Sequence, residues 1–227
     1  MSTKSFRDTM LYPIVFMLVI SFVFVGVLAV MYRGSQAKIE AYEKETYQKM
    51  VLSLLATSIG EATDTKPSHI IADYPNSYNK YVKEISFAGL DKRVFIAEVD
   101  TVVLGYCVDI TGKGLWGTMR ALVALSPDFK TLHGISIYDQ METPGLGARI
   151  GEEWFTNQFN NFPILKTDGK PGDYVLDAQL IPEGAKAEQT NQIQQITGAT
   201  ITSSSVIKML KGEINLVYEA YLRQAKL

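Results

Sequence analysis

The chain has 227 residues, enough for one domain with a full hydrophobic core and an additional segment. Its formal net charge of -2 and its pI of about 5.8 give no basic excess, which argues against nucleic acid as a partner. A single cysteine, Cys107, excludes an internal disulfide, and two distant histidines, His69 and His133, do not form a zinc site by themselves.

The N-terminal region contains a long apolar run. From Met10 to Tyr32 no residue is charged, and at about 1.5 Å per residue this run covers roughly 34 Å, more than the roughly 30 Å of a bilayer core. A secretory signal would have an apolar core of roughly 7 to 15 residues followed by a cleavage site. We therefore predict a retained transmembrane helix over residues 10–32, a short cytoplasmic tail over 1–9, and the rest of the chain outside the cytoplasmic membrane.

The next segment, residues 33–91, is predicted to be a helical stalk and connector. Apolar residues recur among charged ones up to residue 59, and the pattern stops at Gly60, a residue typical of helix ends. Residues 61–91 are rich in turn formers, and we expect one short helix near residues 78–86.

The remaining residues, 92–227, are predicted to form one α+β domain. Four short segments rich in β-branched and aromatic residues, 94–99, 102–110, 119–126 and 132–138, are typical of strands. Turn residues separate them, so we expect two hairpins in an antiparallel sheet.

The C-terminal part of this domain should contribute helices and one more strand. A short helix is expected over residues 152–162, burying Trp154 and stopped by Pro163, and a strand over residues 174–180. In the last helix, apolar residues recur on one stripe from Val206 to Tyr221, so this helix should pack on the sheet.

Three glycine-bearing segments are the candidates for function: GKGLWG at 112–117, METPGLG at 141–147 and TGAT at 197–200. Each alone has an ordinary interpretation as a turn or a helix cap. No catalytic triad, P-loop or dinucleotide-binding motif accompanies them, and Cys107 and His133 lie in predicted strands, where structural roles are expected. We therefore expect no catalytic residue and no metal site.

The pair ETPGLG and TGAT resembles the FMN-binding domain family of redox-driven ion pumps. Its members include the G subunit of the Rnf complex and the C subunit of the sodium-pumping NADH:quinone oxidoreductase. The resemblance implies an anchored protein with covalent FMN, which relays electrons within an ion-translocating ferredoxin:NAD⁺ oxidoreductase. Implied partners are the other subunits, the lipid bilayer and a flavin transferase that uses FAD and magnesium.

The resemblance also implies roles for individual residues. Thr200 would carry the FMN phosphoester, with Thr202 as a minor alternative acceptor. The start of a helix suits a phosphate, because free backbone N–H groups and the positive end of the helix dipole lie there. The phosphate site would comprise Thr197, Gly198, Ala199, Thr200, Thr202 and Ser203. The ring contacts would be Glu142, Thr143, Gly145, Leu146, Leu115 and Trp116, with Lys113 offsetting phosphate charge.

The chain departs from the family at one position. Gln194 stands six residues before the acceptor, where the family usually has an aspartate. This difference leaves open a flavin-free, membrane-anchored scaffold or ligand-binding module. Within the family, the length and the TGATIT segment favour the Rnf G subunit, and GKGLWG favours the quinone oxidoreductase C subunit.

Overall fold

The computed structural model describes residues 10–164 and 176–225 and divides the chain into two units, Met1–Tyr47 and Gln48–Leu227. Helix α1, Leu11–Thr63, begins in the first unit and ends in the second. In the first unit its apolar side chains are exposed, and by length and composition it is suited to cross a membrane. The first unit therefore carries a candidate membrane anchor.

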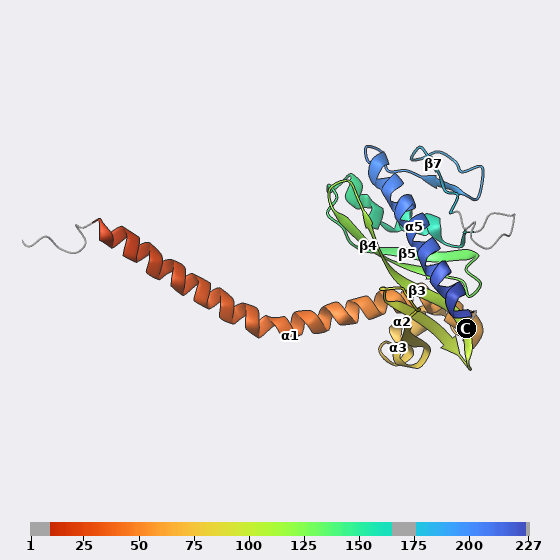
Figure 1. Cartoon of the computed structure of the whole chain (residues 1–227), viewed down its shortest axis with the longest axis horizontal. Coiled ribbons are helices and arrows are strands. Elements are labelled where there is room, and N and C mark those ends of the chain that lie inside the picture. The colour runs from red at the N-terminus through yellow and green to blue at the C-terminus, as the bar shows by residue number, and fades with distance from the viewer. Residues whose placement is uncertain (1–9, 165–175, 226–227) are drawn as a thin grey trace, which may run out of the picture. The chain divides into compact units, whose positions relative to one another are not determined.

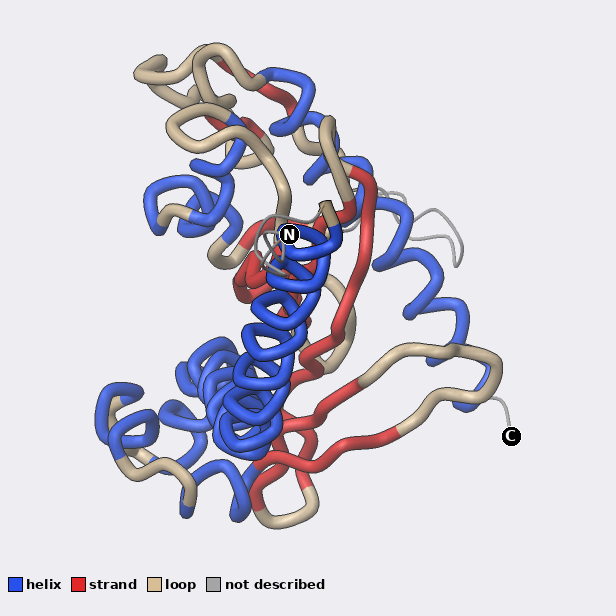
Figure 2. The backbone as a smooth tube through the Cα atoms, turned by 90° about the vertical axis from the view of Figure 1, so that its left-hand side faces the viewer, coloured by secondary structure: helices blue, strands red, loops and turns tan. Residues whose placement is uncertain are grey.

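The second unit is an α+β structure, as predicted. Its helices and strands after α1 are, in chain order, α2 (Pro67–Ala72), α3 (Asn76–Tyr81), β1 (Val82–Ile85), β2 (Val94–Val99), β3 (Val102–Lys113), β4 (Thr118–Leu125), β5 (Thr131–Asp139), the 3-10 helix η2 (Gly147–Gly151), α4 (Glu153–Thr156), the 3-10 helix η3 (Asn157–Phe159), β6 (Phe162–Pro163), β7 (Gln179–Ile181), β8 (Gln192–Gln194) and α5 (Thr200–Ala225). Figure 2 shows the strands with helices on both sides.

Among the described residues, strands β1 to β6 form one antiparallel sheet in sequence order, and β7 and β8 form a separate parallel pair. Bulges interrupt the β2–β3 and β4–β5 pairs. The long β3–β4 hairpin ends in the 114–117 turn, where Gly114 N–H donates to Gly117 O at 2.7 Å. This hairpin carries the GKGLWG segment to one end of the sheet.

Both faces of the sheet are covered. Side chains alternate along a strand, so Met119, Ala121 and Val123 of β4 lie in the core with α5, whereas Leu122 and Ala124 are buried on the other face. On that other face the buried residues of α1 between 51 and 59 supply the covering layer. The apolar run of β4 is therefore that of a strand buried on both sides.

Helix α5 runs across the sheet (Figure 1), and its C-terminal half packs there through an aromatic cluster. Phe129, in the β4–β5 turn, has its ring centroid 4.7 Å from Tyr221 and 4.9 Å from Tyr106 of β3. Tyr218 adds an edge contact to Phe129 at 5.5 Å. These contacts fix one end of α5, so the position of its other end, at Thr200, is defined by the core.

Several sequence expectations need correction. The helix expected near residues 78–86 is found at Asn76–Tyr81, and residues 82–85 are strand β1 because Val82 is buried in pairing with Ala97. Of the strand expected at 174–180, residues 174 and 175 lie outside the described part, and the strand observed is β7. Helix α5 begins at Thr200, ahead of its apolar stripe. The domain divisions at residues 9, 32 and 91 stay predictions.

Candidate functional site

The TGAT segment forms the turn that starts α5. Gly198 has a φ of +77°, in the left-handed region that favours glycine. Ala199 N–H donates to Ile196 O at 2.9 Å, and Thr200 is the first residue of the helix. Thr197, Gly198 and Thr200 are exposed, whereas Ala199 is buried. The structure thus presents the Thr200 side chain on the surface at a helix N-terminus.

The hydroxyls of Thr202 and Ser203, just after Thr200, are buried and engaged within the protein. Ser203 Oγ donates to Ala199 O at 3.1 Å and accepts from Ile196 N–H at 3.0 Å, which closes the first turn of α5. Thr202 Oγ1 donates to a carboxylate, Glu142 Oε2, at 2.7 Å. These hydroxyl protons therefore stabilise the turn, and Thr200 is the exposed acceptor candidate.

Glu142 connects the three glycine-bearing segments. Its side chain is 5% exposed. Oε2 accepts from Thr202 at the start of α5, and Oε1 accepts from Trp116 N–H, at the tip of the β3–β4 hairpin, at 3.0 Å. A buried carboxylate needs such donors to offset its lost hydration. One side chain therefore holds GKGLWG, METPGLG and the TGAT helix together.

Two glycines surround this carboxylate because a side chain would not fit. A Cβ on Gly147 would lie 2.8 Å from Glu142 Oε2 and 2.9 Å from Thr202 Oγ1, and a Cβ on Gly114 would overlap Glu142 Oε1. Gly145 differs, since it has a φ of +74° and open space around it. The backbone O of Thr143 accepts from Leu146 N–H and Ala148 N–H, both at 3.1 Å, which closes this loop.

Large apolar side chains are exposed on the same segments. We call them the apolar rim: Leu115, Trp116, Met141, Leu146 and Ile201, with exposures from 44% to 73%. A Cβ added to Gly198 would lie 3.1 Å from Leu146 Cδ2. The rim therefore reaches residues 197–200, which we call the acceptor turn. Lys113 is exposed at the last pair of the hairpin, opposite Thr118. Exposed apolar side chains gathered on neighbouring segments are typical of a surface that binds a ligand or another protein.

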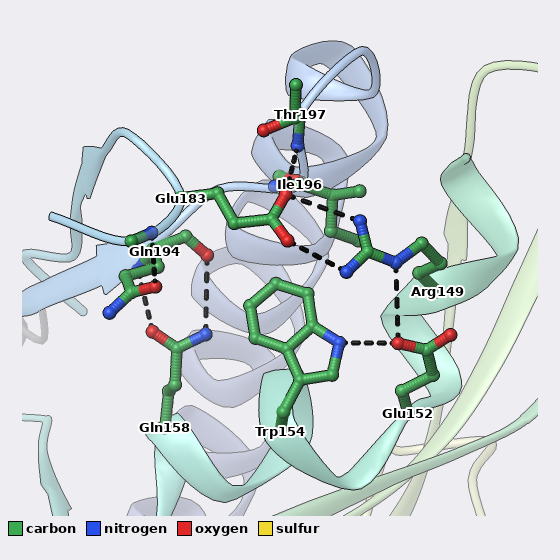
Figure 3. Close-up of polar contacts among 10 residues, drawn as sticks. Arg149, Glu152, Trp154, Gln158, Glu183, Gln194, Ile196 and Thr197 are labelled. Carbon is green, nitrogen blue, oxygen red and sulfur yellow. Dashed lines mark hydrogen bonds and ion pairs between the residues drawn. The ribbon is translucent and has the colours of Figure 1, made fainter. Parts of the chain in front are cut away.

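A second cluster, which we call the brace and which consists of Glu183 and Arg149, is bonded to the acceptor turn (Figure 3). Glu183 accepts from Thr197 N–H at 2.8 Å, and its two oxygens accept from Arg149, at 2.8 and 3.3 Å. Hydrogen bonds from Arg149, and then from Thr197, lower the pKa of Glu183 to about 2. The Arg149 guanidinium also lies over the Trp154 ring, 5.0 Å from its centroid. Trp154, expected to be buried, is therefore partly exposed and stacked against a cation.

Comparison with known proteins identifies this arrangement. Residues 114–215 match the model of the FMN-binding domain family. The chain carries an FMN-binding domain. Its matched residues start at the hairpin tip and continue into α5, so they include the glycines around Glu142, the brace and the TGAT turn.

Two relatives differ in how much of this chain they match. The C subunit of the Na(+)-translocating NADH-quinone reductase of Pasteurella multocida is 35% identical over 56% of this chain, which spans about half, 49%, of that relative. The G subunit of the ion-translocating oxidoreductase complex of Methanosarcina acetivorans is 29% identical over 90% of this chain and 92% of its own length. These relatives are thus subunits of oxidoreductase complexes.

Two solved structures share the fold of this chain. NqrC of Shewanella oneidensis aligns with a TM-score of 0.54 at 19% identity, covering 76% of this chain and 96% of that one. The C subunit of the Na(+)-translocating NADH-quinone reductase of Parabacteroides distasonis gives a TM-score of 0.54 at 24% identity, covering 81% and 95%. These structures confirm the α+β fold predicted from the sequence.

The described residues fit FMN. An exposed hydroxyl at the start of α5, whose first N–H groups lack intrahelical partners, suits its phosphate, and the apolar rim suits its ring system. Glu183 and Arg149 were not expected from the sequence, because they act on the TGAT turn from 14 and 48 positions away and belong to no periodic pattern. The roles of the individual site residues remain predictions.

Proposed function

We propose that this protein is a membrane-anchored electron-transfer subunit with FMN attached as a phosphoester on Thr200. The observation that supports it is the exposed Thr200 hydroxyl, at the start of α5 within residues that match the FMN-binding domain family. FMN supplies one-electron and two-electron redox chemistry when bound, so the protein needs no acid or base of its own. The chain contributes attachment, orientation and an apolar contact surface.

Attachment is a phosphoryl transfer onto the Thr200 hydroxyl. Thr200 Oγ1 attacks the phosphorus on the FMN side of FAD, the bond from that phosphorus to the bridging oxygen breaks, and AMP leaves. The hydroxyl proton passes to a base or to solvent. A separate flavin transferase with magnesium supplies the catalysis. The chain supplies an exposed hydroxyl and, at the start of α5, N–H groups and a dipole that favour the phosphate.

The membrane placement follows from α1. We propose that residues 10–32 cross the cytoplasmic membrane once, that residues 1–9 lie in the cytoplasm, and that the Gln48–Leu227 unit lies outside. The charge-free run and the exposed apolar side chains of the first unit support the crossing. The proposed partners are the lipid bilayer, neighbouring subunits of the complex and the flavin transferase.

Between the two complexes, we propose the ion-translocating ferredoxin:NAD⁺ oxidoreductase of the Rnf type. The Methanosarcina G subunit is 29% identical and matched over 92% of its length, whereas the C subunits are either matched over a shorter part, 49% for Pasteurella, or are less identical, 26% over 87% of the length for Neisseria meningitidis. The sodium-pumping quinone oxidoreductase is the second candidate, since GKGLWG resembles its C subunit and since both solved neighbours carry that name. Purification of the native complex and identification of its other subunits distinguishes the two.

The experiment that tests attachment is mass spectrometry of the full chain from its native membrane, paired with in-gel flavin fluorescence. We expect the peptide with Thr200 to gain the mass of FMN less one water. Thr200→Val should abolish both signals, and Thr200→Ser, which keeps a hydroxyl, should retain them. Label on Thr202 in the Val variant would reassign the acceptor. An unmodified, non-fluorescent wild-type chain would refute attachment and favour the flavin-free scaffold.

A further inference from the structure

The turn Pro182–Ala185 lies against the acceptor turn, although it belongs to none of the three glycine-bearing segments. It is closed by Ala185 N–H donating to Pro182 O at 3.1 Å, with Gly184 at a φ of +80°. From this turn Glu183 reaches Thr197 N–H at 2.8 Å, just before Gly198 and three residues before Thr200. The carboxylate therefore fixes the direction of the peptide that enters the acceptor turn.

Glu183 is itself held on two sides. Arg149 forms a two-pronged pair with it, and Arg149 belongs to η2, directly after the METPGLG segment. The side chains of Arg149 and Glu183 are 26% and 27% exposed, so both remain partly sheltered. Paired guanidinium and carboxylate groups have a fixed planar geometry. Glu183 thus ties the METPGLG segment to the TGAT turn.

Gln194 holds the turn that carries Glu183 (Figure 3). Its Oε1 accepts from Gly184 N–H at 2.9 Å and its Nε2 donates to Ala185 O at 3.1 Å. Gln158 pairs with the Gln194 backbone in both directions, at 2.6 and 3.3 Å. An aspartate at position 194 has no hydrogen to donate to Ala185 O when ionised. The amide of Gln194 is therefore suited to hold the turn that positions Glu183. This role is open to glutamine and not to the aspartate that the family usually has at this position.

We propose that Glu183 is the positioning residue for flavin attachment: by binding Thr197 N–H it sets the acceptor turn so that the Thr200 hydroxyl meets the incoming phosphorus. This inference rests on the proposed attachment at Thr200. Arg149 neutralises the Glu183 charge, so the carboxylate fixes the backbone without leaving an unpaired negative charge beside a phosphate. Gln158 holds the backbone of Gln194, and the Gln194 side chain holds the turn that carries Glu183.

The test measures the initial rate of flavin incorporation into the full, flavin-free chain in detergent, with purified flavin transferase, FAD and magnesium. Glu183→Ala should slow incorporation about tenfold, as expected when a reacting group loses its alignment. Glu183→Gln keeps an acceptor oxygen and should recover most of the rate. Glu188→Ala, an exposed glutamate of the same connection, is the matched control and should match the wild type. Gln194→Leu should also slow incorporation.

A second readout separates positioning from general destabilisation. Amide hydrogen exchange of the peptide around Thr197 should accelerate in Glu183→Ala and not in Glu188→Ala, and this local acceleration should exceed what any fall in the melting temperature of Glu183→Ala accounts for. If the wild type is modified and Glu183→Ala is modified equally fast, the inference is wrong and the proposed function stands. If the wild type gains no flavin on Thr200, the proposed function fails and the inference with it. Loss of rate in Glu188→Ala to the same extent would also overturn the inference.

Discussion

Replacing Thr202 by valine should destabilise the Gln48–Leu227 unit by about 1.5–3 kcal/mol, the contribution of a hydrogen bond to a charged group. Thr202 is 1% exposed and Glu142 is 5% exposed, and their oxygens are 2.7 Å apart. Valine keeps the branched shape of threonine and removes only its hydroxyl group. Glu142 Oε2 is then left buried without the hydrogen bond that Thr202 donates. Thr202→Ser keeps the donor and removes a methyl group, which costs only about 0.8 kcal/mol.

The assay is thermal unfolding of the full chain in detergent, followed by tryptophan fluorescence. Both tryptophans, Trp116 and Trp154, lie in the Gln48–Leu227 unit, so the signal reports on this unit alone. For a domain of this size, about 1 kcal/mol corresponds to about 2–4 °C, so Thr202→Val should lower the melting temperature by about 3–12 °C. If it lowers the melting temperature no more than Thr202→Ser does, Glu142 does not hold the three segments together through this bond.

Two further predictions concern the acceptor turn. Gly198→Ala should destabilise the unit by about 1–2 kcal/mol, the cost of a side chain in the left-handed region, because Gly198 has a φ of +77°. Gly212→Ala in α5, where an added Cβ would have open space, should stabilise the unit slightly. Equal shifts of the melting temperature for the two variants would contradict the argument. The bonds with Arg149 and Thr197 lower the pKa of Glu183 to about 2. The contribution of these bonds to the stability of the folded unit should therefore be complete above the usual pKa of about 4.3 and be lost as the pH falls through about 2. The Thr197 amide shift in NMR should titrate there in the wild type and stay constant in Glu183→Gln.

The sequence predicts those parts of the fold that depend on local patterns. Short β-branched segments identify β2 to β5, and the apolar stripe of α5 identifies the helix that covers one face. The second covering layer, from α1, could not be assigned, because its apolar residues are compatible with an exposed stalk. Similarly, Val82–Ile85 carries too few residues to distinguish a strand from the end of a helix.

The site divides in the same way. Gly114, Gly147 and Gly198 stand out in the sequence, and the structure gives each a reason: close approach to Glu142 for two of them and a positive φ for the third. The brace of Glu183 and Arg149 is different, because its geometry arises from long-range packing and leaves no pattern in the chain. Gln194 was visible as a departure, but its contacts with the Pro182–Ala185 turn were not predictable.

The single carboxylate of Glu142 also sets an order of events during biosynthesis. Its donors come from the hairpin tip, which the ribosome makes before Glu142, and from Thr202, which follows Glu142 by 60 residues. A nascent chain that already contains Glu142 therefore lacks one of these two donors until the start of α5 has emerged. Under the proposed attachment, a product truncated before the start of α5 lacks both Thr200 and the second donor to Glu142, and it is left without the cofactor.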